Sequence, residues 1–347
     1  MSEFRQDPIT GHWTIIAEGR GVRPNEYGTP SPPPPSEGCP FCSGNETGTP
    51  PEIAAYRTKG SRPNTPGWSV RTIPNKFPTV FADAPTGPTT RAPGEVRRPG
   101  IGRHEVVIES PAHAGSLSNL PMGQAREVFR MLRERMRALA SEPGIRGIVA
   151  FENAGPESGG SLFHPHAQIV AVPEVPPLLA DEAAGAARYS RTHGGVCAFE
   201  TEIARERESA VRVVIDTPEM LVYAPFASPF PFEVRLLPFR HAGSLGGAND
   251  VEIHRLAELL PQVLRALSEV VPGASYNFVT RAFPWATPED GAYHWHLDVL
   301  PRLVRPDGFD VGSGIPVNPV APEAAADQLR RAIASTARSS GGESSRP

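Results

Sequence analysis

The chain repeats one order of predicted elements, and this repeat constrains its fold more than any other feature. The pentapeptide HAGSL occurs at 113–117 and again at 241–245, each time after a strand-like apolar run and before a helical pattern. Apolar residues at helical spacing predict helices near 124–140 and 251–271. Because five identical residues in the same surrounding order seldom coincide by chance, we predict a duplicated fold.

Each predicted helix is followed by an apolar strand, a loop and a second strand that opens on His-x-His. These strands are expected at 147–153 and 164–173 in the first half, and at 276–283 and 294–301 in the second. Strands that follow one another with helices between them indicate an α+β class with mainly antiparallel sheets and helices packed on them.

The repeat also predicts where the chain divides. We expect two tandem halves, at 1–185 and 186–336, joined by the stretch ADEAAGAARYSRTHGG. The Ser- and Gly-rich end, 337–347, is expected to be a disordered tail.

Composition excludes several classes of protein. The 347 residues carry a net charge of -4, so the chain lacks the basic excess of a protein that binds nucleic acid polymers. No apolar run approaches the roughly 20 residues that span a bilayer, and the sequence MSEFRQDPIT lacks the apolar core of a signal peptide. Three cysteines do not make a disulfide framework. We therefore expect a cytoplasmic protein without a membrane partner.

Two of the cysteines, Cys39 and Cys42, form a Cys-x-x-Cys knuckle whose spacing suits two thiolate ligands on one tetrahedral zinc ion. The alternatives are a redox pair or a chance pair of small core residues. A redox motif is expected where a helix starts after a strand, whereas this knuckle follows a proline-rich tract. Zinc needs two more ligands and no second Cys-x-x-Cys exists, so His113 and His164 are the best candidates.

The stretch 151–168, FENAGPESGGSLFHPHAQ, carries the strongest chemical signal. Side chains two apart on a strand face the same way, so His166 and Gln168 are expected to face one pocket beside the glycine-rich run. A histidine nucleophile next to an amide donor, with glycines that allow close backbone approach, suits the transfer of a nucleotidyl group.

The same stretch resembles the signature of galactose-1-phosphate uridylyltransferases, which belong to the histidine-triad superfamily. That pattern is Phe-Glu-Asn, a basic residue, Gly, three residues, Gly, four residues and then HPHxQ; this chain departs from it only at Ala154. IIAEGRGVRP, GCPFCSGNE, VRTIPNKFP, ESPAH, PFEVRLLPFRHAG, HWHLDVLPR and GFDVGSGIPVNPV are similar to further family segments. The resemblance covers most of residues 1–331 in the expected order.

The resemblance implies a role for each matching residue. The nucleophile would be His166, with Gln168 and Ser161 holding the transferred phosphoryl group. A structural zinc ion would be bound by Cys39, Cys42, His113 and His164. The substrate would be held by Asn75, Phe77, Asn153 and Gly159 at the nucleotide, by Val311 in the sugar-binding segment, and by Arg20 and Arg23 from the partner subunit of a homodimer.

The implied reaction is uridylyl transfer between UDP-glucose and galactose 1-phosphate, by a ping-pong mechanism through a covalent uridylyl-histidine. An alternative is a relative, such as a phosphorylase, that acts on another nucleoside-diphosphate sugar, for instance an ADP-sugar. Ala154, Ser313 and Lys76 keep that alternative open, because each differs from residues of well-studied members. Which sugar 1-phosphate is used stays open as well.

Two further alternatives remain. A nucleotide hydrolase of the same superfamily usually has a third histidine where Gln168 stands, and an amide cannot move a proton to a leaving group. A non-catalytic zinc protein would not need HPHAQ. In the second half, His294 and His296 could belong to a second metal site with Glu182 as a weak candidate ligand, but structural roles are favoured.

Overall fold

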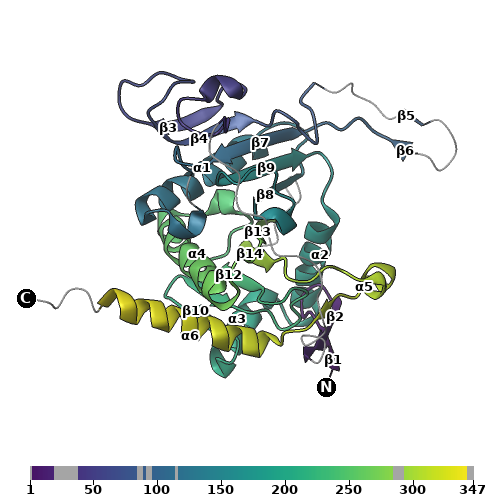
Figure 1. The fold of residues 1–347 in the computed structure, drawn as a ribbon. Helices are drawn as coiled ribbons and strands as arrows, with labels where there is room; N and C mark the ends of the chain where they lie inside the picture. The colour runs from purple at the N-terminus through teal and green to yellow at the C-terminus, as the bar shows by residue number, and fades with distance from the viewer. Residues whose placement is uncertain are drawn as a thin grey trace, which may run out of the picture.

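A single ten-stranded sheet runs through both halves of the molecule (Figure 1). The computed structural model describes residues 2–18, 38–83, 89–90, 96–113, 116–283 and 293–341. The strand order is β10-β11-β12-β14-β13-β8-β9-β7-β4-β3. These strands are β3 (Ala54–Arg57), β4 (Trp68–Pro74), β7 (Arg103–Ile108), β8 (Gly147–Ala154), β9 (His166–Val172), β10 (Val213–Asp216), β11 (Met220–Tyr223), β12 (Val234–Pro238), β13 (Tyr276–Arg281) and β14 (His296–Pro301).

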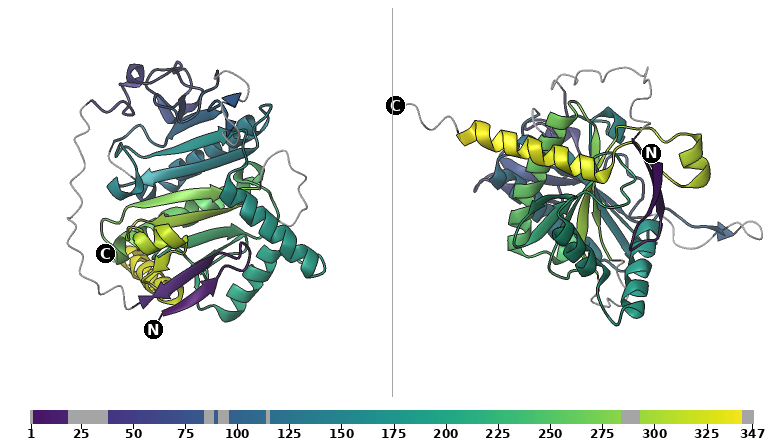
Figure 2. Two further views of the ribbon diagram at one scale, coloured as in Figure 1. Left: turned by 90° about the vertical axis from the view of Figure 1, so that its right-hand side faces the viewer. Right: turned by 90° about the horizontal axis from the view of Figure 1, so that it is seen from below.

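The strand order is symmetric about the pair β8 and β13, which lie antiparallel at the centre. Five strands of the first half extend to one side and five of the second half to the other. Each half places its His-x-His strand, β9 or β14, next to its central strand. The predicted duplication and α+β class are therefore visible in the topology, and Figure 2 shows the strands stacked in this order.

Helices cover both faces of the sheet (Figure 1). The main core lies between the sheet and α1 (Met122–Ala140), α4 (Asp250–Val270) and α6 (Pro322–Gly341). The opposite face of the second half packs on α2 (Pro177–Thr192) and α3 (Ala198–Ser209). Strand alternation separates these faces: Val222 and Leu236 join the main core, whereas Leu221 and Leu237 face α2 and α3.

The repeated HAGSL segments connect the two halves. Leu117 and Leu245 are fully buried and begin short 3-10 turns, η3 (Leu117–Asn119) and η5 (Leu245–Gly247). The turn of each half packs on the helix of the other half, η3 on α4 and η5 on α1, and the Arg137 guanidinium donates to the Gly246 carbonyl. The repeated segments thus make a reciprocal contact, because the turn of each half packs on the long helix of the other half. The two helices, α1 and α4, also pack on each other.

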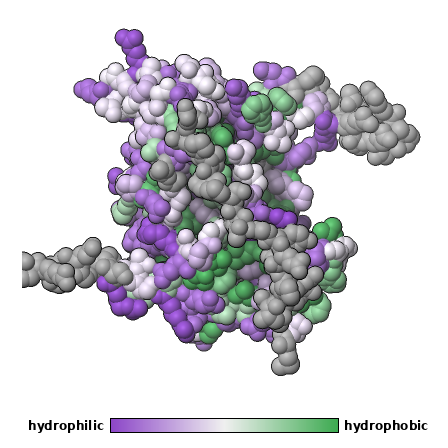
Figure 3. Space-filling model, viewed as in Figure 1, coloured by the Kyte–Doolittle hydropathy of each residue, from purple (hydrophilic) through white to green (hydrophobic). Residues whose placement is uncertain are grey.

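Smaller elements lie at the edges. A separate sheet joins β1 (Ser2–Gln6), β2 (Trp13–Ala17) and β15 (Val317–Asn318), and β5 (Thr89–Thr90) pairs with β6 (Val96–Arg97). The short helix α5 (Gly308–Ser313) lies at one edge of the molecule, where Figure 3 shows apolar atoms. Two further 3-10 turns are η2 (Glu46–Gly48) and η4 (Pro156–Ser158).

The stretch expected to join the two halves forms most of helix α2, so the expected division at residue 185 falls inside a helix. A Cβ atom on Gly185 would lie 2.0 Å from the Ile9 carbonyl oxygen, so this glycine allows close packing rather than flexibility. The tail was expected to be disordered from 337, but α6 continues to Gly341, since extending a helix already packed on α4 is easier than starting one. Residues 342–347 lie outside the described part of the chain.

In the described ranges no helix is long and apolar enough to cross a membrane.

Candidate active site and metal centre

The four residues expected to bind metal come together at one end of β9. The ligand atoms of Cys39, Cys42, His113 and His164 all lie within 4.8 Å of one another. His164 Nδ1 is 3.7 Å from each cysteine Sγ, and His113 Nδ1 is 3.5 Å from Cys42 Sγ. Sulfur and nitrogen ligands on one tetrahedral zinc ion are about 3.5 Å apart, given bonds of about 2.3 and 2.0 Å. The cluster has the donor set and spacing of a metal site.

The contacts of His164 leave the lone pair of its Nδ1 available to bind a metal ion. Its Nε2–H donates to the Ser110 carbonyl oxygen at 2.7 Å, so the lone pair is on Nδ1, which faces the cysteines. Burial lowers the pKa of His164 to about 4, so the ring is neutral near pH 7. A neutral imidazole is the form that binds a metal ion.

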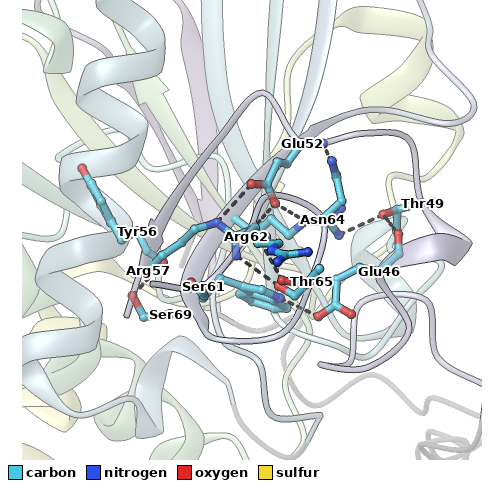
Figure 4. A network of polar contacts seen from close by, with 12 residues as sticks. Glu46, Thr49, Glu52, Tyr56, Arg57, Ser61, Arg62, Asn64, Thr65 and Ser69 are labelled. Atoms are coloured by element: carbon cyan, nitrogen blue, oxygen red, sulfur yellow. Dashed lines mark hydrogen bonds and ion pairs between the residues drawn. The ribbon is translucent and has the colours of Figure 1, made fainter. Parts of the chain in front are cut away.

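A network of polar contacts joins the segment after the cysteine knuckle to the edge of the sheet (Figure 4). The Glu46 carboxylate, just after the knuckle, accepts from Gly44 N–H and from Trp68 Nε1 at 2.8 Å. Arg71 on β4 is 1% exposed and donates to Glu52 at 3.1 Å and to Thr49 at 2.9 Å. These contacts therefore fasten the segment directly after the knuckle to β4.

Phe41, between the two cysteines, links the metal cluster to the expected nucleophile. Its ring is 8% exposed and meets both histidines edge-on, with centroids 5.9 Å from His164 and 5.2 Å from His166. It lies in a small apolar cluster with Ile73 and Val106 on the same side of the sheet.

His166 is buried and oriented by the backbone. Its Nδ1–H donates to the His164 carbonyl oxygen at 2.7 Å, which leaves the lone pair on Nε2. Burial lowers the pKa of His166, although the bond to His164 acts in the opposite direction. The ring is thus a neutral imidazole with one defined nucleophilic nitrogen.

Gln168 lies two residues further along β9, on the same face. Its Oε1 accepts from His104 Nε2 at 2.8 Å, and Asn75 Nδ2 lies 3.4 Å from the same oxygen. Sequence reasoning did not select His104. The alternation of HEVVI places it on the face of β7 that also carries Val106 and Ile108, but nothing in the sequence alone shows that this face adjoins Gln168.

Three further residues expected at the phosphate or nucleotide lie near the end of β8 or in the loop between β8 and β9. Asn153 Oδ1 accepts from Asn277 Nδ2 of the second half at 2.6 Å. Gly159 is exposed and adopts a left-handed conformation with φ +86°. Ser161 is also exposed, five residues before His166. Gly159 and Ser161 therefore belong to an exposed loop that leads to His166.

The remaining expected substrate residues lie further out. Phe77 follows β4 and is 84% exposed, and Val311 on α5 is 75% exposed. Arg20 and Arg23 lie outside the described residues.

The corresponding site of the second half is closed by charged side chains. His296 Nδ1–H donates to the His294 carbonyl at 3.2 Å, as in the first half, but its Nε2 lies 3.1 Å from Glu182 on α2. Asp298, in the place of Gln168, is paired with Arg235 at 2.8 Å and with Arg281 at 3.2 Å. Although burial acts to raise the pKa of Glu182, His296 and the two arginines lower it to about 2.

His294 itself lies in a second Cys/His group. The ligand atoms of Cys197, His241 and His294 are within 4.8 Å of one another, and His241 Nε2 is 3.1 Å from Glu200. Cys197 is buried, and its sulfur lies close to ring nitrogens of the two histidines.

A duplicated α+β fold with one buried and oriented histidine, an adjacent amide and a Cys₂His₂ cluster is typical of enzymes that transfer nucleotidyl groups. The model for the galactose-1-phosphate uridyl transferase N-terminal domain matches residues 1–176. The chain belongs to the galactose-1-phosphate uridylyltransferase family and is a transferase, as its sequence predicted.

Individual relatives cover nearly the whole chain. An ADP-glucose phosphorylase of Arabidopsis thaliana is 32% identical over 94% of this chain and 92% of its own length. A galactose-1-phosphate uridylyltransferase of Thermotoga maritima is 28% identical over 95% of this chain and 98% of its own. A crystal structure of an Arabidopsis thaliana ADP-glucose phosphorylase with bound ADP-glucose has a TM-score of 0.80 at 28% identity, covering 95% of this chain and 99% of that one.

Proposed function

We propose that the protein transfers a nucleotidyl group from a nucleoside-diphosphate sugar to a phosphate acceptor through a covalent intermediate on His166. The first candidate is uridylyl transfer between UDP-glucose and galactose 1-phosphate, the activity named for the family. The observation that carries the proposal is the bond from His166 Nδ1 to the His164 carbonyl, beside an amide held by His104.

The reaction has two balanced steps. Nε2 of neutral His166 attacks the α-phosphorus, an N–P bond forms, and the P–O bond to the sugar 1-phosphate breaks. An oxygen of the acceptor phosphate then attacks the same phosphorus and the N–P bond breaks, which restores the imidazole. The leaving group is a phosphate in both directions, so little acid assistance is needed.

The chain's own groups would stabilise charge on the transferred phosphoryl group. Gln168 can donate from its NH₂ group, and Ser161 can donate from its hydroxyl after a movement of its exposed loop. Asn153, Gly159, Asn75 and Phe77 are proposed to contact the nucleotide, with Val311 at the sugar. Arg20 and Arg23 are proposed to bind the sugar phosphate across a homodimer, since guanidinium groups suit bidentate phosphate contacts.

We propose that Cys39, Cys42, His113 and His164 hold a zinc ion, because their donor set, spacing and neutral His164 fit it. With all four positions taken by protein ligands, such an ion would be structural, fixing the backbone that leads to His166. The three cysteines form no disulfide, which agrees with the proposed cytoplasmic location.

A second candidate is a phosphorylase that transfers an adenylyl group from ADP-glucose to inorganic phosphate. Two observations favour it: 32% identity to the Arabidopsis thaliana ADP-glucose phosphorylase and the TM-score of 0.80. Both candidates use His166 in the same way and differ in the base and the acceptor.

Nucleotide sugars labelled at the α-phosphate separate these candidates. The protein is incubated with UDP-glucose or ADP-glucose, and acid-labile label on the protein is measured before and after adding galactose 1-phosphate or inorganic phosphate. Uridylylation that galactose 1-phosphate discharges supports the first candidate, and adenylylation that phosphate discharges supports the second. Label should be absent in His166→Asn and unchanged in His254→Asn, a matched change on α4; equal label in both variants would refute the proposal.

A further inference from the structure

We propose that His104 is a positioning residue that fixes the amide of Gln168 with its NH₂ group toward the transferred phosphoryl group. The inference rests on the proposed nucleotidyl transfer and adds a residue that the family signature at 151–168 does not contain. His104 lies on β7, next to β9, and is 9% exposed.

The contacts of His104 define its tautomer. The backbone N–H of Thr79 donates to Nδ1 at 3.1 Å, so Nδ1 must be the acceptor nitrogen. The proton of the neutral ring is therefore on Nε2, which lies 2.8 Å from Gln168 Oε1. Asn75 Nδ2 lies 3.0 Å from the same nitrogen, so its hydrogens must point past Nε2, toward Gln168 Oε1. Burial lowers the pKa of His104, so the ring keeps this single-proton form near neutral pH.

This donor decides which end of the Gln168 amide faces the substrate. The two ends of an amide have nearly the same shape, and an unconstrained side chain can present either one. Oε1 is held on the side of His104 and Asn75, because Asn75 Nδ2 lies 3.4 Å from the same oxygen. The NH₂ group is thus left to donate. A flipped amide would place its oxygen against the negative phosphoryl oxygens.

His104 also holds the loop that follows β4. Its carbonyl accepts from Asn75 N–H at 2.8 Å, while Asn75 Oδ1 accepts from Phe77 N–H at 2.8 Å. With the Thr79 contact, the residue binds both ends of the 75–79 segment. One buried histidine therefore links the expected nucleotide loop to the amide beside the nucleophile.

The test compares variants of His104 with and without a donor at this position. His104→Phe keeps the ring volume and removes both nitrogens, whereas the amide of His104→Gln can still donate to Gln168. We expect His104→Phe to lower kcat about 10- to 100-fold, less than the 10²–10³-fold loss typical of removing a transition-state donor itself. KM for the nucleotide sugar should change less than kcat, and His104→Gln should recover most of the rate.

Single-turnover labelling of His166 in a double-mutant cycle gives the decisive result. If His104 acts through Gln168, adding His104→Phe to Gln168→Ala should cost little beyond Gln168→Ala alone. Losses that multiply, or equal losses in His104→Phe and His104→Gln, would overturn the proposal. His104→Leu replaces the Phe variant if the latter does not fold, and His254→Phe is the matched control.

A wild-type protein that takes up no label would refute the proposed function itself, whereas an active wild type with an unaffected His104→Phe would refute only this inference.

Discussion

His166 and His164 use opposite ring nitrogens to hold their orientations. His166 donates from Nδ1 to the His164 carbonyl at 2.7 Å, while His164 donates from Nε2 to the Ser110 carbonyl at 2.7 Å. One ring is left with a lone pair on Nε2 and the other with a lone pair on Nδ1. Two histidines separated by one proline therefore keep different nitrogens available: Nδ1 of His164 faces the two cysteines, and Nε2 of His166 is left for the proposed attack on phosphorus.

Cys39→Ser tests the metal centre. We expect the purified protein to lose one equivalent of zinc per chain, because the hydroxyl is a poor substitute for a thiolate ligand. The protein should also unfold at lower temperature, since metal binding contributes to folding free energy. Metal analysis by mass spectrometry beside thermal unfolding makes the comparison. An unchanged zinc content in Cys39→Ser would contradict the assignment.

Phe41→Leu tests the connection between the knuckle and the nucleophile. Leucine keeps the site apolar but removes the ring that contacts His164 and His166. We expect unchanged zinc content and a kcat lowered about 10-fold, because small displacements of a reacting group have large effects on rate. Phe4→Leu, at a ring that is 61% exposed, is the control and should keep full activity. A Phe41→Leu enzyme with wild-type kcat would show that the contact only fills space.

Local sequence patterns predicted the parts of the site that lie within one segment. His166 and Gln168 are two residues apart on one strand, and the two cysteines form one knuckle, so period and spacing were sufficient. His104 could not be found in this way. It reaches Gln168 through the register of β7 and β9, two strands far apart in sequence.

The fold, too, was predictable only where the signal lies within one segment of the sequence. The HAGSL repeat and the element order predicted the duplication, but not the single sheet, because the pairing of β8 with β13 uses ordinary strand edges. The stretch expected to join the halves is helical. Alanine favours a helix there, and Gly185 is required by the close approach of Ile9.

Asp298→Gln tests whether the second half could work like the first. The change introduces the amide that Gln168 provides, but it removes the charge that pairs with buried Arg235 and partly exposed Arg281. We expect a loss of about 3–5 kcal/mol in the free energy of unfolding, as for other buried pairs that lose one partner. Urea denaturation measures this loss. The control is Asp216→Asn, because Asp216 forms an exposed pair with Arg207. The control should change the free energy of unfolding by less than about 1 kcal/mol.

The same variant makes a prediction about activity. Combined with His166→Asn, it should give no covalent label, because His296 remains held beside Glu182. Label on His296 in the double variant would show that Asp298 alone prevents the second half from forming a covalent intermediate.

Glu152→Gln tests a buried carboxyl pair in the main core, on the face of the sheet opposite His166. Glu152 and Glu109 are 2% and 0% exposed, and both Glu109 oxygens lack a hydrogen-bond partner among the described residues. Burial raises the pKa of both carboxyl groups, that of Glu152 to about 8.

The sign of the pH dependence follows from this shift. An unfolded glutamate titrates near 4.5, so the folded protein holds an extra proton between about pH 4.5 and 8. The stability that protonated Glu152 contributes to the folded protein is fully present below pH 4.5 and is lost as the pH rises through 8. Glutamine stays neutral throughout, so Glu152→Gln should exceed the wild-type Tm by about 2 °C or more at pH 9, with a smaller difference at pH 5. Scanning calorimetry at both pH values checks this against exposed Glu208→Gln; a Tm difference independent of pH would show that the pair does not hold the proton.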